Sequence, residues 1–182
     1  MYSISTRTSF IRNIIQQESW YVLYTRPNFE KKVSKKLMEI GFFTYLPLKN
    51  ELRCWNGRKA WVETPLFRSY VFVKTDLKKK DLVFKASGII KYISIGKKLA
   101  VLREREIDRI KQLCLHPGKI DIEFICLEVG KKVEISGGVL KGLQGLLTEV
   151  DDNKKVRIYI EGLNCFASVT LNFDSISLKY IS

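Results

Sequence analysis

The sequence predicts an α+β protein in two parts, an antiparallel sheet flanked by helices followed by a small SH3-like β-barrel. Helical and strand-like segments alternate through the first 115 residues, whereas only short strand-like segments follow. A Pro-Gly pair at 117–118 separates the two patterns. We therefore expect a tail at 1–19, a first domain at 20–115, a linker at 116–127 and a second domain at 128–182.

The net charge of the sequence also changes near this Pro-Gly pair. Residues 1–120 contain 25 Lys and Arg against 10 Asp and Glu, and residues 121–182 contain 7 against 9. A net charge of +13 concentrated in this way attracts polyanions, with nucleic acid as the first candidate and an anionic membrane surface as the second.

Other features limit the class of protein. No apolar run approaches the roughly 20 residues that span a bilayer, and the first 19 residues lack a secretory signal. We expect a cytoplasmic monomer with no membrane contact. The four cysteines form no CxxC pair, and the sequence contains a single histidine, so we expect neither a disulfide framework nor a metal or cofactor. These residues are Cys54, Cys114, Cys126, Cys165 and His116.

The first strand and helix come together in WYVLYTRPNFEKKVSKKL at 20–37. The apolar run at 20–25 predicts a buried strand, Asn28 is expected to cap a helix that begins at Phe29, and Gly41 suits the turn after it. One face of this helix is apolar over about 80°, and another is basic over about 140°. The apolar face holds Phe29, Val33, Leu37 and Ile40, and the basic face holds Lys31, Lys32, Lys35 and Lys36.

The rest of the first domain is predicted to be a meander of strands with two further helices. Asn56-Gly57 predicts a type I′ hairpin turn because both residues tolerate positive φ. The remaining expected elements are a strand at 66–76, a short helix at 78–87 ended by Gly88, a strand at 88–96 and a helix at 103–114.

The second domain is expected to contain five strands. They are VEIS, GLLTEV, VRIYI, CFASVTL and SISLKYI, with turns at Gly137-Gly138, at Asp151-Asp152-Asn153 and near Gly162. The segment VEISGGVLKGLQGLLTEVDD at 133–152 resembles a KOW motif, with glycines where the chain turns sharply or passes close to a neighbouring strand. An unrelated small barrel would share this pattern.

The first domain resembles the amino-terminal domain of the NusG family of transcription elongation factors. The matching segments are WYVLYT with its basic helix, PLFRSYVFV at 65–73 and GIIKYISIG at 88–96. Arg68-Ser69 replaces the Pro-Gly of the FFPGYV-like housekeeping segment. This departure favours the operon-specific branch, which includes RfaH and the UpxY-type capsule-locus antiterminators and would fit control of surface polysaccharide genes.

The resemblance implies that the amino domain binds the clamp helices of RNA polymerase through an apolar patch and suppresses pausing or termination. Aromatic-rich surfaces are typical of protein interfaces. The patch maps onto Tyr24, Phe67, Tyr70, Phe72, Ile95, Ile107 and Ile110.

The resemblance also implies contact with the non-template DNA strand. Lysines on one helix face neutralise phosphates and make binding salt-dependent. The corresponding residues are Arg26, Lys31, Lys32, Lys35 and Lys36.

The KOW domain of such proteins recruits a ribosomal protein or a termination factor through the loop at 139–143. Exposed Leu140 or Leu143 would suit that role. The strand-rich sequence of this domain predicts a standing barrel rather than a helical hairpin. The polymerase gate-loop segment corresponds to Lys79-Lys80-Asp81, which lacks the His-Thr-Thr pattern of a relative.

The sequence offers no enzyme signature, and we expect a non-enzymatic protein. It contains no nucleophile–base spacing, phosphate-loop pattern or metal-ligand cluster. A nucleic-acid hydrolase that uses Glu51, Glu63 or Asp76 is the residual enzyme hypothesis. Two further hypotheses involve no catalysis: a general NusG-type elongation factor and a ribosome-associated RNA-binding KOW module.

Overall fold

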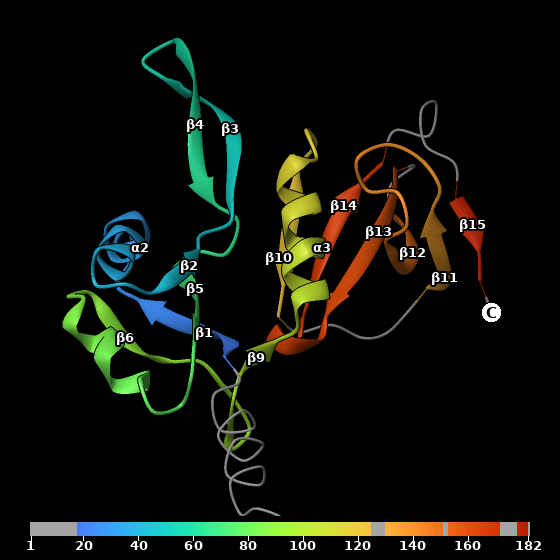
Figure 1. The fold of residues 1–182 in the computed structure, drawn as a ribbon. Helices are drawn as coiled ribbons and strands as arrows, with labels where there is room; N and C mark the ends of the chain where they lie inside the picture. Colours follow the sequence, from blue (N-terminus) through green and yellow to red (C-terminus); the bar gives the residue numbers. More distant parts are fainter. Residues whose placement is uncertain (1–17, 125–129, 151–152, 172–177, 182) are drawn as a thin grey trace, which may run out of the picture.

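The apolar segment at 20–25 forms the central strand of the amino-terminal sheet in the computed structural model (Figure 1). The structure describes residues 18–124, 130–150, 153–171 and 178–181, so most of the expected tail at 1–19 and Cys126 lie outside it. The sheet is antiparallel and runs β2-β5-β1-β6, with β9 also paired to β1. Its strands are β1 (Ser19–Thr25), β2 (Phe43–Tyr45), β5 (Tyr70–Thr75), β6 (Ile89–Tyr92) and β9 (Val101–Leu102).

Both faces of this sheet are covered. Helix α2 (Glu30–Glu39) and the 3-10 helix η1 (Lys80–Lys85) pack on one face, where Leu23 joins a buried cluster with Val33 and Val83. Helix α3 (Glu104–Leu115) belongs with the other face, where the buried cluster includes Val22 and Phe72. Burial on both faces explains why β1 is apolar without alternation.

The start of α2 differs from the prediction. Asn28 does not cap the helix: Phe29 is the N-cap residue, no side chain caps it, and Asn28 adopts φ of +65°. The cause is tertiary, because the Arg26 N–H donates to the Gly88 carbonyl at 2.8 Å and bends the chain before the helix. Gly41 adopts φ of +91° after the helix, as predicted.

The predicted hairpin is confirmed. Strands β3 (Leu48–Trp55) and β4 (Arg58–Pro65) pair in register, and Asn56 and Gly57 have φ of +48° and +77°. The two strands form a sheet of their own, which projects away from the amino-terminal sheet (Figure 1).

Three neighbouring elements are shorter than predicted. The strand expected at 66–76 begins at Tyr70, because Ser69 has φ of +63°. The helix expected at 78–87 is the 3-10 helix η1, and Gly88 ends it with φ of +104°. The strand expected at 88–96 is interrupted after β6: β7 (Ser94–Ile95) pairs instead with β8 (Lys98–Leu99).

The five strands expected in the second part are confirmed. Together with one more strand they form an antiparallel sheet in the order β10-β14-β13-β12-β11-β15, which we call the C-terminal sheet. The turn at Asp151-Asp152 lies outside the described residues. The five strands are β11 (Lys131–Ile135), β12 (Gln144–Val150), β13 (Asn153–Ile160), β14 (Cys165–Thr170) and β15 (Leu178–Tyr180), with the 3-10 helix η2 (Glu161–Leu163) before β14.

The sixth strand lies in the segment expected to be a linker at 116–127. Strand β10 (Ile120–Glu123) pairs antiparallel with β14, with Ile120 opposite Val169. Residues 125–127 lie outside the described part of the chain. The free edge of β14 offers unpaired backbone groups, and an adjacent segment with alternating apolar residues satisfies them. The segment therefore extends the C-terminal sheet.

Helix α3 stands between the two sheets (Figure 1). Its residues Ile107, Ile110 and Leu113 are fully buried in one cluster that contains Phe72 of the amino-terminal sheet and Ile158 of the C-terminal sheet. The two parts of the chain therefore share a hydrophobic core around this helix.

We predict that Ile110→Ala lowers the free energy of unfolding by about 2–5 kcal/mol, because it removes buried methylene groups and leaves a cavity. Chemical denaturation measured by far-ultraviolet circular dichroism checks this value. Ile90→Ala is the control: Ile90 is 50% exposed, and we expect a change within about 0.5 kcal/mol. Equal effects of the two changes would contradict the shared core.

Candidate partner-binding surfaces

The apolar patch expected to bind polymerase is largely buried. Four of its seven residues are at most 2% exposed, two tyrosines are half-buried, and one isoleucine is 41% exposed. Tyr24 and Tyr70 meet edge to face with ring centroids 6.0 Å apart. The buried residues are Phe72, Ile107, Ile110 and Phe67, the half-buried ones are Tyr70 and Tyr24, and the exposed one is Ile95.

The C-terminal sheet and the segment leading into it cover part of this patch. Phe67 lies in the same buried cluster as Val156 and Val169 of the C-terminal sheet. Tyr70 contacts Phe124, just after β10, with ring centroids 5.9 Å apart. Burial raises the pKa of the Tyr70 hydroxyl. The structure thus brings most of the expected patch together, but at a contact between the two sheets.

A buried carboxylate joins α3 to the C-terminal sheet. Glu106 is 2% exposed; one oxygen accepts the Gly162 N–H at 2.7 Å and the other accepts the Arg103 N–H at 3.0 Å. Glu161 lies beside them and forms ion pairs with Arg103 at 3.3 Å and Arg105 at 3.8 Å. We call Arg103, Arg105, Glu106, Glu161 and Gly162 the polar joint.

The polar joint is tightly packed around Gly162. A Cβ atom at this position would lie 2.6 Å from the Val101 carbonyl oxygen, which is backbone and cannot move aside easily. Cys165 is close by, and burial together with the Glu106 charge raises the pKa of its thiol to about 12. A side chain at position 162 would therefore push the two sheets apart.

Sequence reasoning missed the polar joint. Glu106 and Gly162 are 56 positions apart, and neither residue belongs to a motif that points to the other. The available signal was weak: Glu106 is the third residue of a helix, where a glutamate favours a capping box. Only half of this motif forms: the Glu106 side chain accepts the Arg103 N–H, and the Arg103 side chain has no acceptor atom for the N–H of Glu106.

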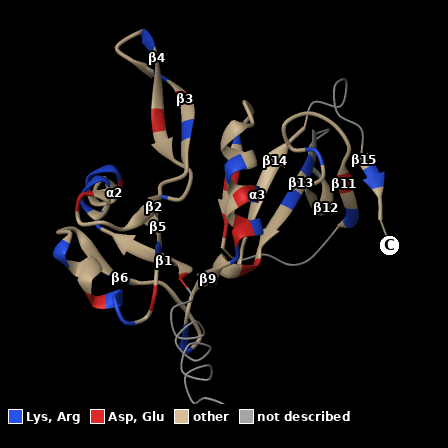
Figure 2. Cartoon of the chain, viewed as in Figure 1, with Lys and Arg blue, Asp and Glu red and all other residues tan. Residues whose placement is uncertain are grey.

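The basic face of α2 is exposed as expected. Arg26 and the four lysines are all exposed, and Figure 2 shows the basic residues of α2 on its outer side. Two of the lysines pair with carboxylates, Lys31 with Glu63 at 3.4 Å and Lys36 with Glu39 at 3.0 Å. Exposed pairs of this kind contribute at most about 1 kcal/mol. Within the described residues, Lys32 and Lys35 have no carboxylate partner.

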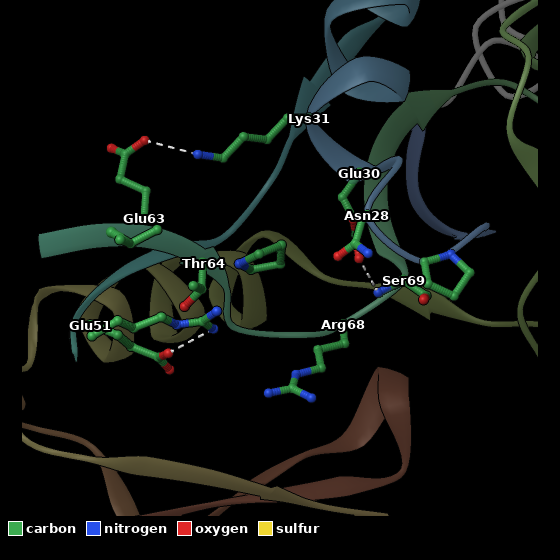
Figure 3. Close-up of a pocket in the computed structure, with 12 residues that line it drawn as sticks. Asn28, Glu30, Lys31, Glu51, Glu63, Thr64, Arg68 and Ser69 are labelled. Carbon is green, nitrogen blue, oxygen red and sulfur yellow. Dashed lines mark hydrogen bonds and ion pairs between the residues drawn. The ribbon is translucent and has the colours of Figure 1, made fainter. Parts of the chain in front are cut away.

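A groove of about 640 Å³ opens between the start of α2 and the base of the β3–β4 hairpin (Figure 3). Buried Glu30 fixes its floor by accepting the Ser69 N–H at 2.7 Å. Glu51 pairs with Arg53 at 3.3 Å on the hairpin side. Arg68, also on the groove, has no hydrogen bond or ion pair within the described residues, and its guanidinium points away from Glu30 and Ser69.

Ser69 occupies a backbone conformation that glycine adopts more easily. Its φ of +63° lies in the left-handed region, and two hydrogen bonds hold it there: its N–H donates to Glu30, and its carbonyl accepts the Thr25 N–H at 2.8 Å. The glycine of the housekeeping pattern would fit this turn without strain. The turn places exposed Arg68 beside the basic helix.

The loop expected to bind a KOW partner differs from the prediction. Leu140 and Leu143 are 0% and 4% exposed, so the expectation of an exposed leucine is wrong. Both belong to the core cluster, because the loop folds back and the Gly142 N–H donates to the Ile135 carbonyl at 2.7 Å. Val139, 46% exposed, is the accessible apolar residue of this loop.

The three carboxylates of the residual enzyme hypothesis all have other partners within the described residues. Glu51 and Glu63 pair with Arg53 and Lys31, and buried Asp76 accepts the N–H groups of Lys78 and Lys79 at 2.7 and 2.9 Å. No group of three or more potential metal ligands occurs among the residues that the structure describes. None of the described helices is long and apolar enough to cross a membrane.

A basic amino-terminal domain with a sheet between helices, followed by a strand-rich domain consistent with a KOW domain, is the architecture expected of the NusG class. The family model described as "Transcription termination factor nusG" matches residues 18–111, just over half of the chain. The chain belongs to this family.

Curated relatives agree with the family. The NusG proteins of Borreliella burgdorferi and Bacillus subtilis, both named "Transcription termination/antitermination protein NusG", are 23% and 26% identical. These alignments cover 87% and 88% of this chain and 97% and 98% of the relatives. Neither relative is named as an enzyme or as an operon-specific factor.

A solved structure supports the fold. The structure described as "Domain interaction in Thermotoga maritima NusG" matches with a TM-score of 0.50 and 23% identity, and the match covers 88% of this chain and 96% of that one. The likeness therefore extends over both parts of the chain.

We predict that Glu106→Gln lowers the free energy of unfolding by about 1–3 kcal/mol, because an amide cannot accept hydrogen bonds at both terminal atoms and leaves a buried N–H unsatisfied. Denaturant unfolding checks the value. Glu104→Gln is the matched control on the same helical turn: its exposed pair with Lys74 should contribute less than about 1 kcal/mol. An unchanged stability of Glu106→Gln would argue against the polar joint.

Proposed function

We propose that this protein is a transcription elongation factor that binds the clamp helices of RNA polymerase with its amino domain and suppresses pausing or termination. The observation that carries the proposal is the family match over residues 18–111, which spans both proposed binding surfaces. The clustering of apolar side chains on one side of the amino-terminal sheet, and of lysines on α2, supports two separate partners.

Polymerase binding through the apolar patch requires the C-terminal sheet to move. Phe67 and Ile107 are buried in the cluster that includes the C-terminal sheet, and only Tyr24, Tyr70 and Ile95 are partly accessible. The association constant measured for polymerase then equals the intrinsic constant multiplied by the fraction of molecules with the sheets apart. Changes at the polar joint should alter that fraction.

We predict that Tyr24→Ala with Tyr70→Ala weakens binding to purified polymerase about tenfold or more, because aromatic side chains at an interface centre contribute most of its energy. Gly162→Ala should strengthen binding several-fold, since its Cβ clashes with the Val101 carbonyl and separates the sheets. Fluorescence titration of the labelled protein with polymerase measures both effects.

The control for these variants is Tyr180→Ala. Tyr180 is a 63% exposed aromatic residue on β15, away from the patch, and its loss should leave polymerase affinity unchanged. A loss of affinity in Gly162→Ala with retained secondary structure would contradict the covered patch. An unchanged affinity in the double tyrosine variant would contradict the patch itself.

The finer proposal is an operon-specific factor of the RfaH or UpxY type that contacts the non-template DNA strand. Lys32 and Lys35 are exposed on the basic face, Arg26 is exposed before α2, and Arg68 lies on the adjacent groove where the housekeeping pattern has proline. These cations supply phosphate contacts beside a groove that can admit a displaced strand.

A general NusG-type factor is the second candidate. It is favoured by the names of the curated relatives, which the alignments cover over nearly their whole length. Recruitment of a ribosomal protein or termination factor is proposed for the C-terminal domain, with Val139 as the exposed apolar contact. Recovery of ribosomal RNA without polymerase would instead support a ribosome-associated KOW module.

We predict that chromatin occupancy of the tagged protein is confined to one or a few transcription units, and that Lys32→Glu with Lys35→Glu reduces it on the order of tenfold by removing phosphate contacts. Polymerase binding in solution should be unaffected, because α2 covers the opposite face of the sheet from α3.

Lys97→Glu with Lys98→Glu is the matched control. It makes the same change in charge at exposed residues of the same domain and should leave occupancy in place. Occupancy on most active genes would contradict the operon-specific proposal and favour the general factor. Equal losses in the two lysine pairs would show that net charge alone, and not the α2 face, directs binding.

A further inference from the structure

The β3–β4 hairpin exposes three large apolar side chains. Leu52, Trp55 and Trp61 are 51%, 55% and 71% exposed, and the hairpin pairs with neither of the larger sheets. Two exposed tryptophans on one projecting element are unusual unless they contact a partner, because their burial would be favourable. Neither the polymerase patch nor the α2 face uses them.

All charged side chains in the same part of the hairpin are basic. Residues 52–61 contain three cationic side chains and no carboxylate. Arg58 and Lys59, at the tip, are exposed and have no ion pair within the described residues, whereas Arg53 pairs with Glu51 (Figure 2). Cations without a neighbouring carboxylate favour a polyanionic partner, because they attract phosphate and meet no competing negative charge on this part of the hairpin.

The pairing register places a cation beside each tryptophan. Trp55 lies opposite Arg58, so the two side chains share one face of the hairpin. Trp61 lies opposite Leu52 on the other face, which also holds Lys59, two residues before Trp61. Each face therefore combines an aromatic ring with a positive charge.

We propose that this hairpin is a binding arm for single-stranded nucleic acid. Unpaired bases stack on Trp55 on one face of the hairpin or on Trp61 on the other, and Arg58 and Lys59 contact the adjacent phosphates. A duplex is excluded as the preferred ligand because its bases already stack on each other and present no free ring faces. DNA and RNA strands share this chemistry, and the test distinguishes them.

The hairpin also leads toward the α2 face. Its base lines the groove beside α2, where Lys31 and Arg53 pair with Glu63 and Glu51, so Arg68 is the cation in the groove that can contact a strand leading from the tip toward α2 (Figure 3). The arm thus extends nucleic-acid contact beyond the surface in the proposed function. It does not depend on polymerase binding.

The experiment measures fluorescence anisotropy of labelled 12-nucleotide oligothymidylate, oligouridylate and a DNA duplex of equal length with the purified full chain and no polymerase. We expect binding of the single strands, and Trp55→Ala with Trp61→Ala should raise their Kd at least tenfold. The duplex Kd should change less than twofold. The strand with the lower Kd, oligothymidylate or oligouridylate, shows whether the ligand is DNA or RNA.

Two further variants separate stacking from a folding defect. Trp55→Phe with Trp61→Phe keeps aromatic rings and should retain most of the affinity. Arg58→Glu with Lys59→Glu keeps both tryptophans and should weaken single-strand binding at least fivefold. Tyr180→Ala, which removes an exposed aromatic residue with Lys131 6.0 Å from its ring centroid, is the control with unchanged Kd.

The inference is overturned if the single strands do not bind, or if the double alanine variant binds them as well as Tyr180→Ala does. It is also overturned if the phenylalanine variant binds as poorly as the alanine variant, since stacking would then play no part. Polymerase is absent from the assay, so its outcome is independent of the proposed elongation function.

Discussion

The structure depends on the burial of one helix from two sides. Ile107, Ile110 and Leu113 of α3 are fully buried, and one sheet alone could cover only one side of a helix. Each such side chain contributes about 1.5–3 kcal/mol when it leaves water. The amino-terminal sheet buries one side of α3 and the C-terminal sheet buries the other. The helix therefore joins two parts of the chain that differ strongly in net charge.

The same helix explains why the proposed polymerase patch and the core cannot be separated by sequence alone. A hydrophobic residue that binds a partner and one that packs inside have the same identity and spacing. The family resemblance assigns Phe72 and Ile107 to the patch, and both lie inside the shared cluster. Their availability to polymerase depends on the free energy of separating two sheets, which includes the polar joint at Glu106.

Local signals predict local structure well, and tertiary contacts account for what they miss. The Asn56-Gly57 turn follows from two residues that accept positive φ, and it forms as predicted. Asn28 has the right chemistry for a helix cap, but long-range bonds at Arg26 and Glu30 set the loop instead. Likewise, the segment predicted as a linker carries β10: its alternating apolar residues suit a strand, but its pairing depends on the free edge of β14, which is distant in the sequence.

The two kinds of surface differ in what they require of the molecule. Contact with polymerase through the patch needs the sheets apart, whereas α2 and the β3–β4 hairpin are already exposed when the sheets are together. Under the proposed function, nucleic acid therefore binds before the sheets separate, and long-range attraction by the +15 charge of residues 1–120 favours its binding first. Binding to nucleic acid first would raise the local concentration of polymerase at the closed protein without requiring any change in its core.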